Sequence, residues 1–197
     1  MSTTGDPLEV IAGALHPSIG ERVRDGTAEV LAFAVPGLPP GAVWRVRVTS
    51  LDHPVGAYVG VWPNGPARVL GDVPEAFLDL AASWGVHLAD ADAVLGYVLA
   101  FLEVTRGPAV IVQPIERLED IPWRPGSTAE DFRRAAFLED APVRPLLSEP
   151  EGDRFHVEVW LVVDQRIQLN TFEVERDGSL AATFRVIADN LPLPIAR

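Results

Sequence analysis

The pattern of hydrophobic and polar positions over the first third of the chain predicts a broken helix followed by three strands. Apolar residues recur at spacings near 3.6 over Leu8–Arg24, which is typical of a helix, and Pro17 should interrupt it. Alternation with a period of two then predicts strands over Thr27–Val35, Ala42–Leu51 and Gly56–Trp62. Because the links between these strands are short, we expect an antiparallel meander.

The middle of the chain has helical patterns. Asp72 and Glu75 have the spacing of a capping box, which predicts a helix that ends near Trp84. A second predicted helix runs from about residue 90 to residue 106. Its apolar residues cover nearly the whole circumference, and a helix of this kind is normally buried. We therefore expect it to be the central packing element of the fold.

A short strand and a capped helix are predicted next. Ala109–Gln113 is apolar and short, as expected for a strand. Ser127 and Glu130 form another capping-box pattern, which predicts a helix that ends near Leu138. The stretch Pro142–Pro150 is expected to be irregular.

Three further strands are predicted at the end of the sequence, over Arg154–Val163, Ile167–Glu175 and Leu180–Ala188. Asp177-Gly178 is a hairpin-turn signal, so these strands should also form a meander. The apolar phase shifts within the middle strand, and a bulge near Asn170 would account for this shift.

Strands and helices cluster along the sequence instead of alternating, which favours the α+β class. The length of 197 residues fits one domain. We therefore predict a single α+β domain over residues 8–197. In this domain two antiparallel three-stranded meanders surround a buried central helix, with flanking helices. Residues 1–7 are predicted to be a flexible N-terminus.

Composition excludes several kinds of chemistry. The chain has no cysteine, and all 16 residues in the combined count of lysine and arginine are arginine. Thiol nucleophiles, cysteine-ligated metals, a lysine Schiff base and a P-loop lysine are therefore impossible. The bias toward Ala, Gly, Pro, Arg and Val is typical of a GC-rich bacterial genome.

The net charge of −12 makes the chain acidic. A field of this sign repels phosphate backbones, so we expect no nucleic-acid partner. No apolar run approaches the ~20 residues of a membrane span, and the N-terminus lacks the pattern of a signal peptide. We therefore expect a cytoplasmic protein with no membrane partner.

The four histidines match no standard metal motif. His156 and Glu158 share one face of a predicted strand, and Glu173 or Glu175 on the adjacent strand could supply a third ligand. The alternative is a polar, solvated sheet face. We predict neither a metal site nor a cofactor.

Motifs for nucleophilic catalysis and phosphate binding are missing as well. No serine lies in a G-x-S-x-G elbow, and no glycine-rich phosphate loop is present. Asp52 and His53 could belong to a triad with a distant serine, but neighbouring positions alone do not make a triad. These absences favour a protein that is not an enzyme.

Tryptophans supply the remaining candidate residues. Trp160 shares its strand face with His156 and Glu158, opposite an apolar stripe, so this face is either covered or forms a pocket or interface. Trp123 lies in a proline-flanked loop and is also placed for contact. We therefore take Trp160, His156, Glu158 and Trp123 as candidate ligand-binding or partner-binding residues.

The sequence thus favours a non-catalytic accessory or protein-interaction protein with an acidic surface. Its partner would be another protein or a second copy of the chain. The alternative is a small-molecule-binding pocket protein, or a small enzyme, that uses the C-terminal sheet face around Trp160.

Overall fold

The computed structural model of the chain describes residues 6–49, 55–63, 65–107, 110–140 and 143–194. The chain divides into two compact units. The first unit comprises Met1–Leu88, Ala100–Pro108 and Asp177–Ser179, and the second comprises Ala89–Leu99, Ala109–Arg176 and Leu180–Arg197. Helices and antiparallel sheets are segregated along the sequence, which confirms the α+β class.

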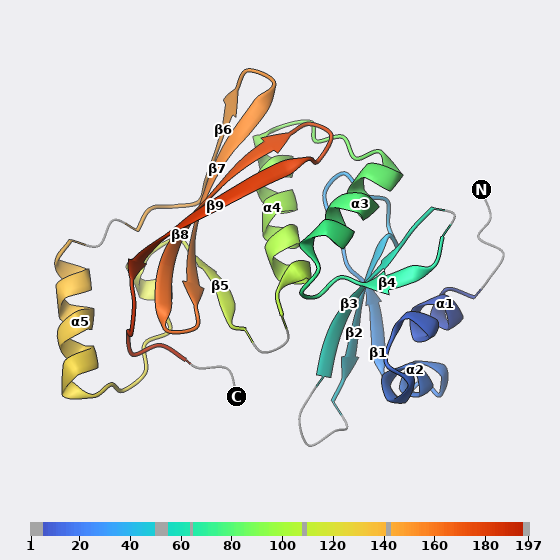
Figure 1. The fold of residues 1–197 in the computed structure, drawn as a ribbon, viewed down its shortest axis with the longest axis horizontal. Helices are drawn as coiled ribbons and strands as arrows, with labels where there is room; N and C mark the ends of the chain where they lie inside the picture. The colour runs from blue at the N-terminus through green and yellow to red at the C-terminus, as the bar shows by residue number, and fades with distance from the viewer. Residues whose placement is uncertain (1–5, 50–54, 64, 108–109, 141–142, 195–197) are drawn as a thin grey trace. The chain divides into compact units, whose positions relative to one another are not determined.

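The first unit contains a four-stranded antiparallel sheet in the order β1-β2-β3-β4 (Figure 1). Its strands are β1 (Glu29–Ala32), β2 (Val43–Val48), β3 (Val55–Val61) and β4 (Ala67–Val69). The first three lie where alternation predicts them, and β4 is a fourth strand that we did not expect. Three residues are too few for alternation to reveal a strand, so only the pairing with β3 identifies it.

One face of this sheet is covered by α1 (Pro7–Ala14) and α2 (Pro17–Arg24). The predicted interruption at Pro17 is confirmed, because Pro17 is the first residue of α2. Residues 1–5 of the predicted flexible terminus lie outside the described residues, whereas Asp6 caps α1. The core on this face contains Ile11, Ala12, Leu15, Val23, Val46, Val59 and Ala67.

The opposite face of the sheet packs against α3 (Pro74–Trp84). A side chain on Gly60 of β3 would place its Cβ 2.9 Å from Leu80 of α3, so glycine permits this close approach. The predicted capping box at the start of α3 is wrong. Val73 is the N-cap residue, and Asp72 adopts a left-handed conformation in which its N–H donates to the carbonyl of Thr105.

The predicted central helix is α4 (Ala91–Thr105). Only Asp92 among its 15 residues is exposed, which confirms that it is buried nearly all round. Its residues up to Leu99 belong to the second unit, and the rest belong to the first. None of the helices within the described residues combines the length and apolar character that crossing a bilayer requires.

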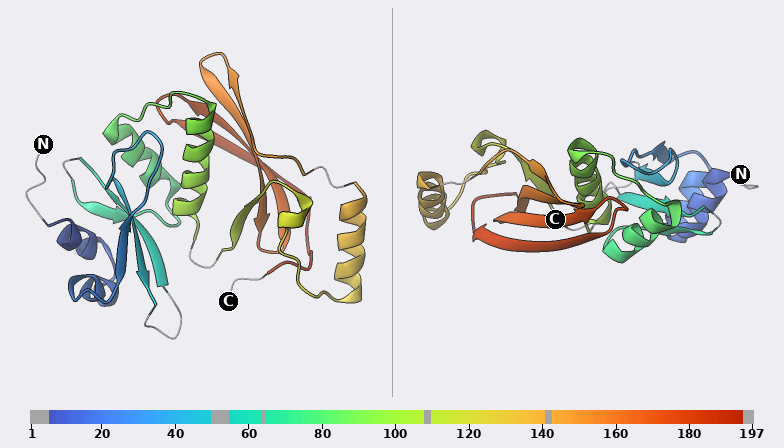
Figure 2. Two further views of the ribbon diagram at one scale, coloured as in Figure 1. Left: turned by 180° about the vertical axis from the view of Figure 1, so that it is seen from behind. Right: turned by 90° about the horizontal axis from the view of Figure 1, so that it is seen from above.

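The second unit contains a five-stranded antiparallel sheet. Its strands are β5 (Val112–Ile115), β6 (Leu147–Glu151), β7 (Arg154–Val163), β8 (Arg166–Glu175) and β9 (Leu180–Ala188). They follow the order β5-β7-β8-β9, and β6 also pairs with β7 (Figure 2). Four of these strands were expected, because β5 overlaps the predicted strand Ala109–Gln113, whose first residue lies outside the described residues. The predicted three-stranded meander is therefore part of a larger sheet, and β6 is the strand that was not expected.

The expectation that Pro142–Pro150 is irregular holds for residues 143–146 but is wrong from Leu147 onward, because β6 pairs with the first half of β7. Pro142 lies outside the described residues. A proline cannot donate to a ladder, but an edge strand tolerates one, and β6 pairs only with β7. Pro150 therefore disguises the strand in the sequence without preventing it.

The middle strand β8 pairs regularly with β7 along its whole length, so the expected bulge near Asn170 is wrong. The irregularity in its pairing with β9 falls between Ile167 and Gln168 instead. The apolar phase shifts because the two ends of β8 are buried on opposite faces. Ile167 is buried on one face, whereas Phe172 and Val174 are buried on the other.

The 3₁₀ helix η1 (Leu118–Asp120) and α5 (Thr128–Glu139) complete the second unit. Ser127 caps α5, and its side chain and Glu130 form the predicted capping box.

Candidate functional site

Trp160 lies in a covered core. Its side chain is 3% exposed, and it pairs across the sheet with Ile115 of β5 and Leu169 of β8. The cluster around it consists of Ile115, Ile121, Phe137, Val162, Ile167, Leu191 and Leu193. The indole Nε1 of Trp160 has no hydrogen-bond partner in the described part of the chain, so the ring contributes as an apolar group. We call this set of residues the Trp160 cluster.

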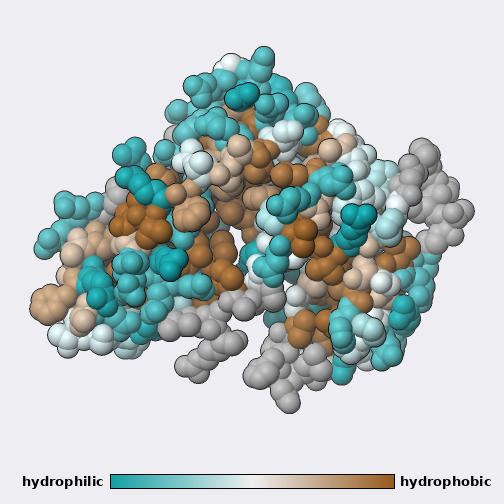
Figure 3. All heavy atoms as spheres, in the orientation of Figure 1, coloured by the Kyte–Doolittle hydropathy of each residue, from teal (hydrophilic) through white to brown (hydrophobic). Residues whose placement is uncertain are grey.

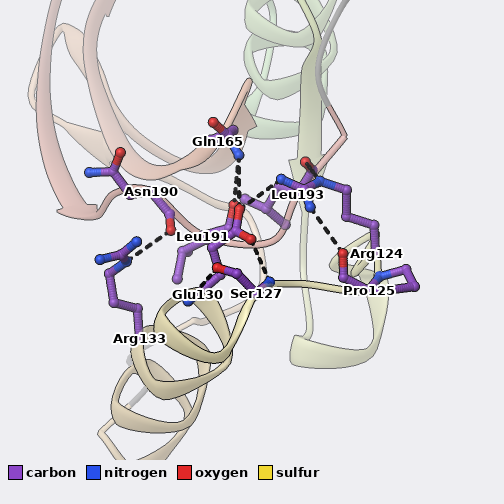
Figure 4. A network of polar contacts seen from close by, with 9 residues as sticks. All are labelled: Arg124, Pro125, Ser127, Glu130, Arg133, Gln165, Asn190, Leu191 and Leu193. Carbon is purple, nitrogen blue, oxygen red and sulfur yellow. Dashed lines mark hydrogen bonds and ion pairs between the residues drawn. The ribbon is translucent and has the colours of Figure 1, made fainter.

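A polar network connects the start of α5 to the C-terminal segment, residues 189–194, which covers the Trp160 cluster (Figure 4). Arg124 Nε donates to the carbonyl of Leu193 at 2.8 Å, and Arg124 Nη2 donates to Glu130 Oε1 at 2.8 Å. The Ser127 backbone N–H donates to Glu130 Oε2 at 2.7 Å. This bond, together with those from the Ser127 side chain and Arg124, lowers the pKa of Glu130 to about 2. The start of α5 is thereby tied to the C-terminal segment.

Two further bonds hold the C-terminal segment, one from α5 and one from the turn between β7 and β8. Arg133 Nε donates to the carbonyl of Asn190 at 3.0 Å, and Gln165 Nε2 donates to the carbonyl of Leu191 at 3.3 Å. Leu191 and Leu193 are both fully buried. The network therefore holds the backbone of Leu191 and Leu193, whose side chains belong to the Trp160 cluster.

Trp123 packs at the edge of the same cluster and is partly buried. Its ring centroid is 6.3 Å from that of Phe137 of α5, and the Arg134 guanidinium lies over the ring at 4.8 Å. Trp123 and Trp160 thus meet in one cluster. Both contribute to packing there, and the binding role of the partly exposed Trp123 stays a prediction.

His156 and Glu158 lie beyond the covered part of the same sheet face. His156 Nδ1 is 2.9 Å from Glu173 Oε1, and His156 Nε2 is 3.7 Å from Glu158 Oε1. The hydrogen bond to Glu173 is the main cause that raises the pKa of His156 above its ordinary value. Glu149 of β6 pairs with His156 from the other side. We call Glu149, His156, Glu158 and Glu173 the acidic face.

Of the two carboxylates that the sequence offered as a third ligand, Glu173 lies beside His156, whereas Glu175 forms an ion pair with Arg154 at 3.3 Å. Within the described ranges, however, no group of three or more His, Asp or Glu residues is arranged to hold a metal ion. The acidic face instead presents two carboxylates within 4 Å of one imidazole, with Glu149 opposite His156 on the neighbouring strand, and this negative charge attracts cations to the sheet surface.

The other histidines considered in the sequence do not form a catalytic group within the described residues. Asp52 and His53 lie outside the described residues. His16 is the N-cap residue of α2 and is within 2.9 Å of Ser18 Oγ, and His87 is exposed.

The sequence predicts β9 as a strand, but it does not indicate that this strand lies at the edge of the sheet. In the described structure β9 pairs with β8 alone, so its far edge is open. Phe184 is 66% exposed and Val186 is 41% exposed, and both lie on the face opposite the acidic face. In the sequence, Ala182, Phe184 and Val186 alternate like an ordinary half-buried strand, so only the strand order and the exposed fractions reveal their exposure. Figure 3 shows that brown apolar residues interrupt the teal polar surface in this view.

Comparisons with protein-family models, with curated proteins and with solved structures found no match to this chain.

Proposed function

We propose that this chain is a non-catalytic protein-interaction protein that binds an extended partner segment along the open edge of β9. The observation that carries this proposal is the exposure of β9, where every residue from Ala181 to Val186 is exposed and the large apolar side chain of Phe184 is 66% exposed. An open edge offers unpaired backbone N–H and C=O groups, and an added strand satisfies them.

The apolar side chains on one face of β9 indicate which residues the partner segment should have on that face. Phe184 and Val186 share a face, and an added strand places alternate side chains beside them. Apolar partner residues would cover these two side chains and remove their surface from water. Every second residue of the partner is therefore expected to be apolar.

The acidic face specifies the other side. Ala181 of β9 pairs with Glu173 of β8, which in turn pairs with His156 of β7. A partner strand beyond Ala181 lies two strand spacings, roughly 10 Å, from the backbone of Glu173. Because alanine is small, a long basic side chain can extend over it toward the Glu173 carboxylate. The remaining residues of the partner are therefore expected to include arginine or lysine.

The net charge of −12 supports a basic partner as well, because opposite charge accelerates encounter. The partner is thus a segment of alternating apolar and basic residues. The position of Trp160 does not favour the alternative of a small-molecule pocket around it, because its ring is part of the core.

The test uses synthetic peptides of alternating valine and arginine, labelled for fluorescence anisotropy. Matched peptides carry glutamate in place of arginine, or N-methyl groups that block strand pairing. We expect saturable binding of the valine–arginine peptide alone, which weakens as salt rises.

Two exposed phenylalanines supply a matched pair of variants. Phe184→Ser should weaken peptide binding at least tenfold, whereas Phe132→Ser, at a 74% exposed position on α5, should leave it unchanged. Equal binding to both variants would overturn the assignment to β9. Binding of the glutamate peptide as tight as that of the arginine peptide would overturn the role of the acidic face. A dimer of the unmodified chain, dissociated by Phe184→Ser in light scattering, would identify a second copy as the partner.

A further inference from the structure

A second candidate site lies in the first unit, independent of β9. A cavity of about 430 Å³ is lined by Trp62, Pro63, Gly65, Pro66, Arg68, Asp79 and Ser83. Its volume is within the range of natural small-ligand pockets. One wall comes from residues between β3 and β4 and from Arg68 of β4, and the other comes from α3.

The indole of Trp62 is fixed in position. Its Nε1 donates to Asp79 Oδ2 at 2.9 Å, and the residue is mostly buried. A Cβ on Gly60 would lie 3.2 Å from the ring, so the sheet packs closely beneath it. The ring therefore presents a rigid apolar surface to the cavity.

Two opposite charges contact this one indole without contacting each other. The Arg68 guanidinium carbon lies 5.2 Å from the centroid of the Trp62 ring, and the Asp79 carboxylate lies at its N–H edge. In the described structure, no ion pair joins Arg68 to Asp79, and neither forms an ion pair with another residue. The cavity thus offers a cation and an anion, each with unused hydrogen-bonding capacity.

Ser83 adds a neutral polar group beside the anion. It follows Asp79 by four residues on α3, so both side chains lie on the same face of the helix. The Pro63 and Pro66 rings supply apolar contacts on the opposite wall. The polar groups are thus separated across the cavity by the apolar surface of the indole.

We infer that this cavity binds a small zwitterion of the amino-acid class. Arg68 would receive the ligand carboxylate, and Asp79 and Ser83 would receive its ammonium group. The apolar side chain of the ligand would lie against Trp62 and the proline rings. A ligand with both charges pairs with Arg68 and Asp79 together, whereas a singly charged ligand forms an ion pair with only one of these two exposed residues.

The experiment follows the indole N–H signal of Trp62 by two-dimensional NMR during titration of the full chain with free amino acids. Trp62→Phe serves only to assign this signal among those of the five tryptophans. Two modified forms of each amino acid isolate the charges: the N-acetyl form lacks the ammonium group, and the amide lacks the carboxylate. We expect saturable shifts with at least one free amino acid that has an apolar side chain, and at least tenfold weaker binding of both modified forms.

Single variants then test the assignment of each charge. Arg68→Gln and Asp79→Asn should each reduce affinity at least tenfold, whereas Arg45→Gln, at another exposed arginine of the first unit, should not. Saturation with the modified forms at the same affinity would show an apolar cavity only and would overturn the zwitterion assignment. If no free amino acid produces a saturable shift, the assignment of a binding site to this cavity would be overturned. Neither outcome bears on peptide binding at β9.

Discussion

At the scale of single residues, environment decides the role of each aromatic side chain. Trp160 and Phe184 both lie on strands of the second sheet, yet the first is enclosed by a core cluster and the second faces solvent. Alternation in the sequence identifies the two faces of each strand but not which face another layer will cover. For this reason spacing offered Glu173 and Glu175 on the strand beside His156 without selecting one of them, and it left open whether Trp160 is covered.

Replacement of Trp160 tests its role in the core. Trp160→Ala should lower the free energy of unfolding by about 3–5 kcal/mol, because it empties a large enclosed volume. Trp160→Phe should cost less, since the lost indole N–H has no hydrogen-bond partner in the described residues. Urea unfolding measures both changes. An alanine variant as stable as the unmodified chain would contradict the core assignment.

Tyr58 should ionise at unusually high pH. Its burial, and then its hydrogen bond to Glu103 Oε1 at 2.5 Å, raise the pKa of the phenol to about 12. The raised pKa means that Tyr58 contributes stability fully below pH 10, and that this contribution is lost as the pH rises toward 12.

Ultraviolet absorbance of tyrosinate follows this titration, with Tyr58→Phe as the difference control. Glu103→Gln should lower the pKa of Tyr58, because the phenol then loses a charged acceptor. A Tyr58 step at the ordinary tyrosine value, with the fold intact, would contradict the prediction.

At the scale of secondary-structure elements, the sequence predicted features that depend on neighbouring residues, but it did not predict strands that depend on a distant partner strand. The capping box at Ser127 and the interruption at Pro17 depend on neighbouring residues, so the sequence contains them fully. Strands β4 and β6 are short or contain proline, and only their partner strands make them strands. Asp72 failed as a cap because a distant carbonyl at the end of α4 holds its backbone.

The tie between α5 and the C-terminal segment should weaken in acid. The lowered pKa of Glu130 means that its contribution to stability is present above pH 4.5 and is lost as the pH falls toward 2. Glu130→Gln should therefore lower the urea midpoint near neutral pH and make little difference near pH 2. Glu139→Gln, at the exposed far end of α5, is the matched control and should have little effect at either pH. A Glu130→Gln effect that is independent of pH would contradict this account.

At the scale of the whole molecule, α4 is the element that both units contain. Residues up to Leu99 belong to one unit and later residues to the other, and helix formation is cooperative along its length. The circumferential apolar pattern correctly indicated a buried helix. It could not indicate how the contacts of that helix are divided, because a sequence pattern does not name the partner of each residue.

A break in α4 should therefore destabilise both units together, as the prediction of a single domain requires. Leu99→Pro removes a helical hydrogen bond and should cost ~3 kcal/mol or more. Hydrogen exchange measured by mass spectrometry should then show faster exchange in β2–β3 and in β7–β8 alike. Faster exchange confined to one sheet would show instead that the units are separate domains.

The place of Leu191 and Leu193 in the Trp160 cluster also determines when this core can form during synthesis. A ribosome releases the chain from its N-terminal end, and Leu191 and Leu193 are among the last described residues to emerge. Until they do, β7 and β8 can pair, but Trp160 and Ile167 lack two of the side chains that cover them. This core is therefore completed only after Leu193 has left the ribosome, and a nascent chain that stalls shortly before Leu191 exposes it to chaperones and proteases.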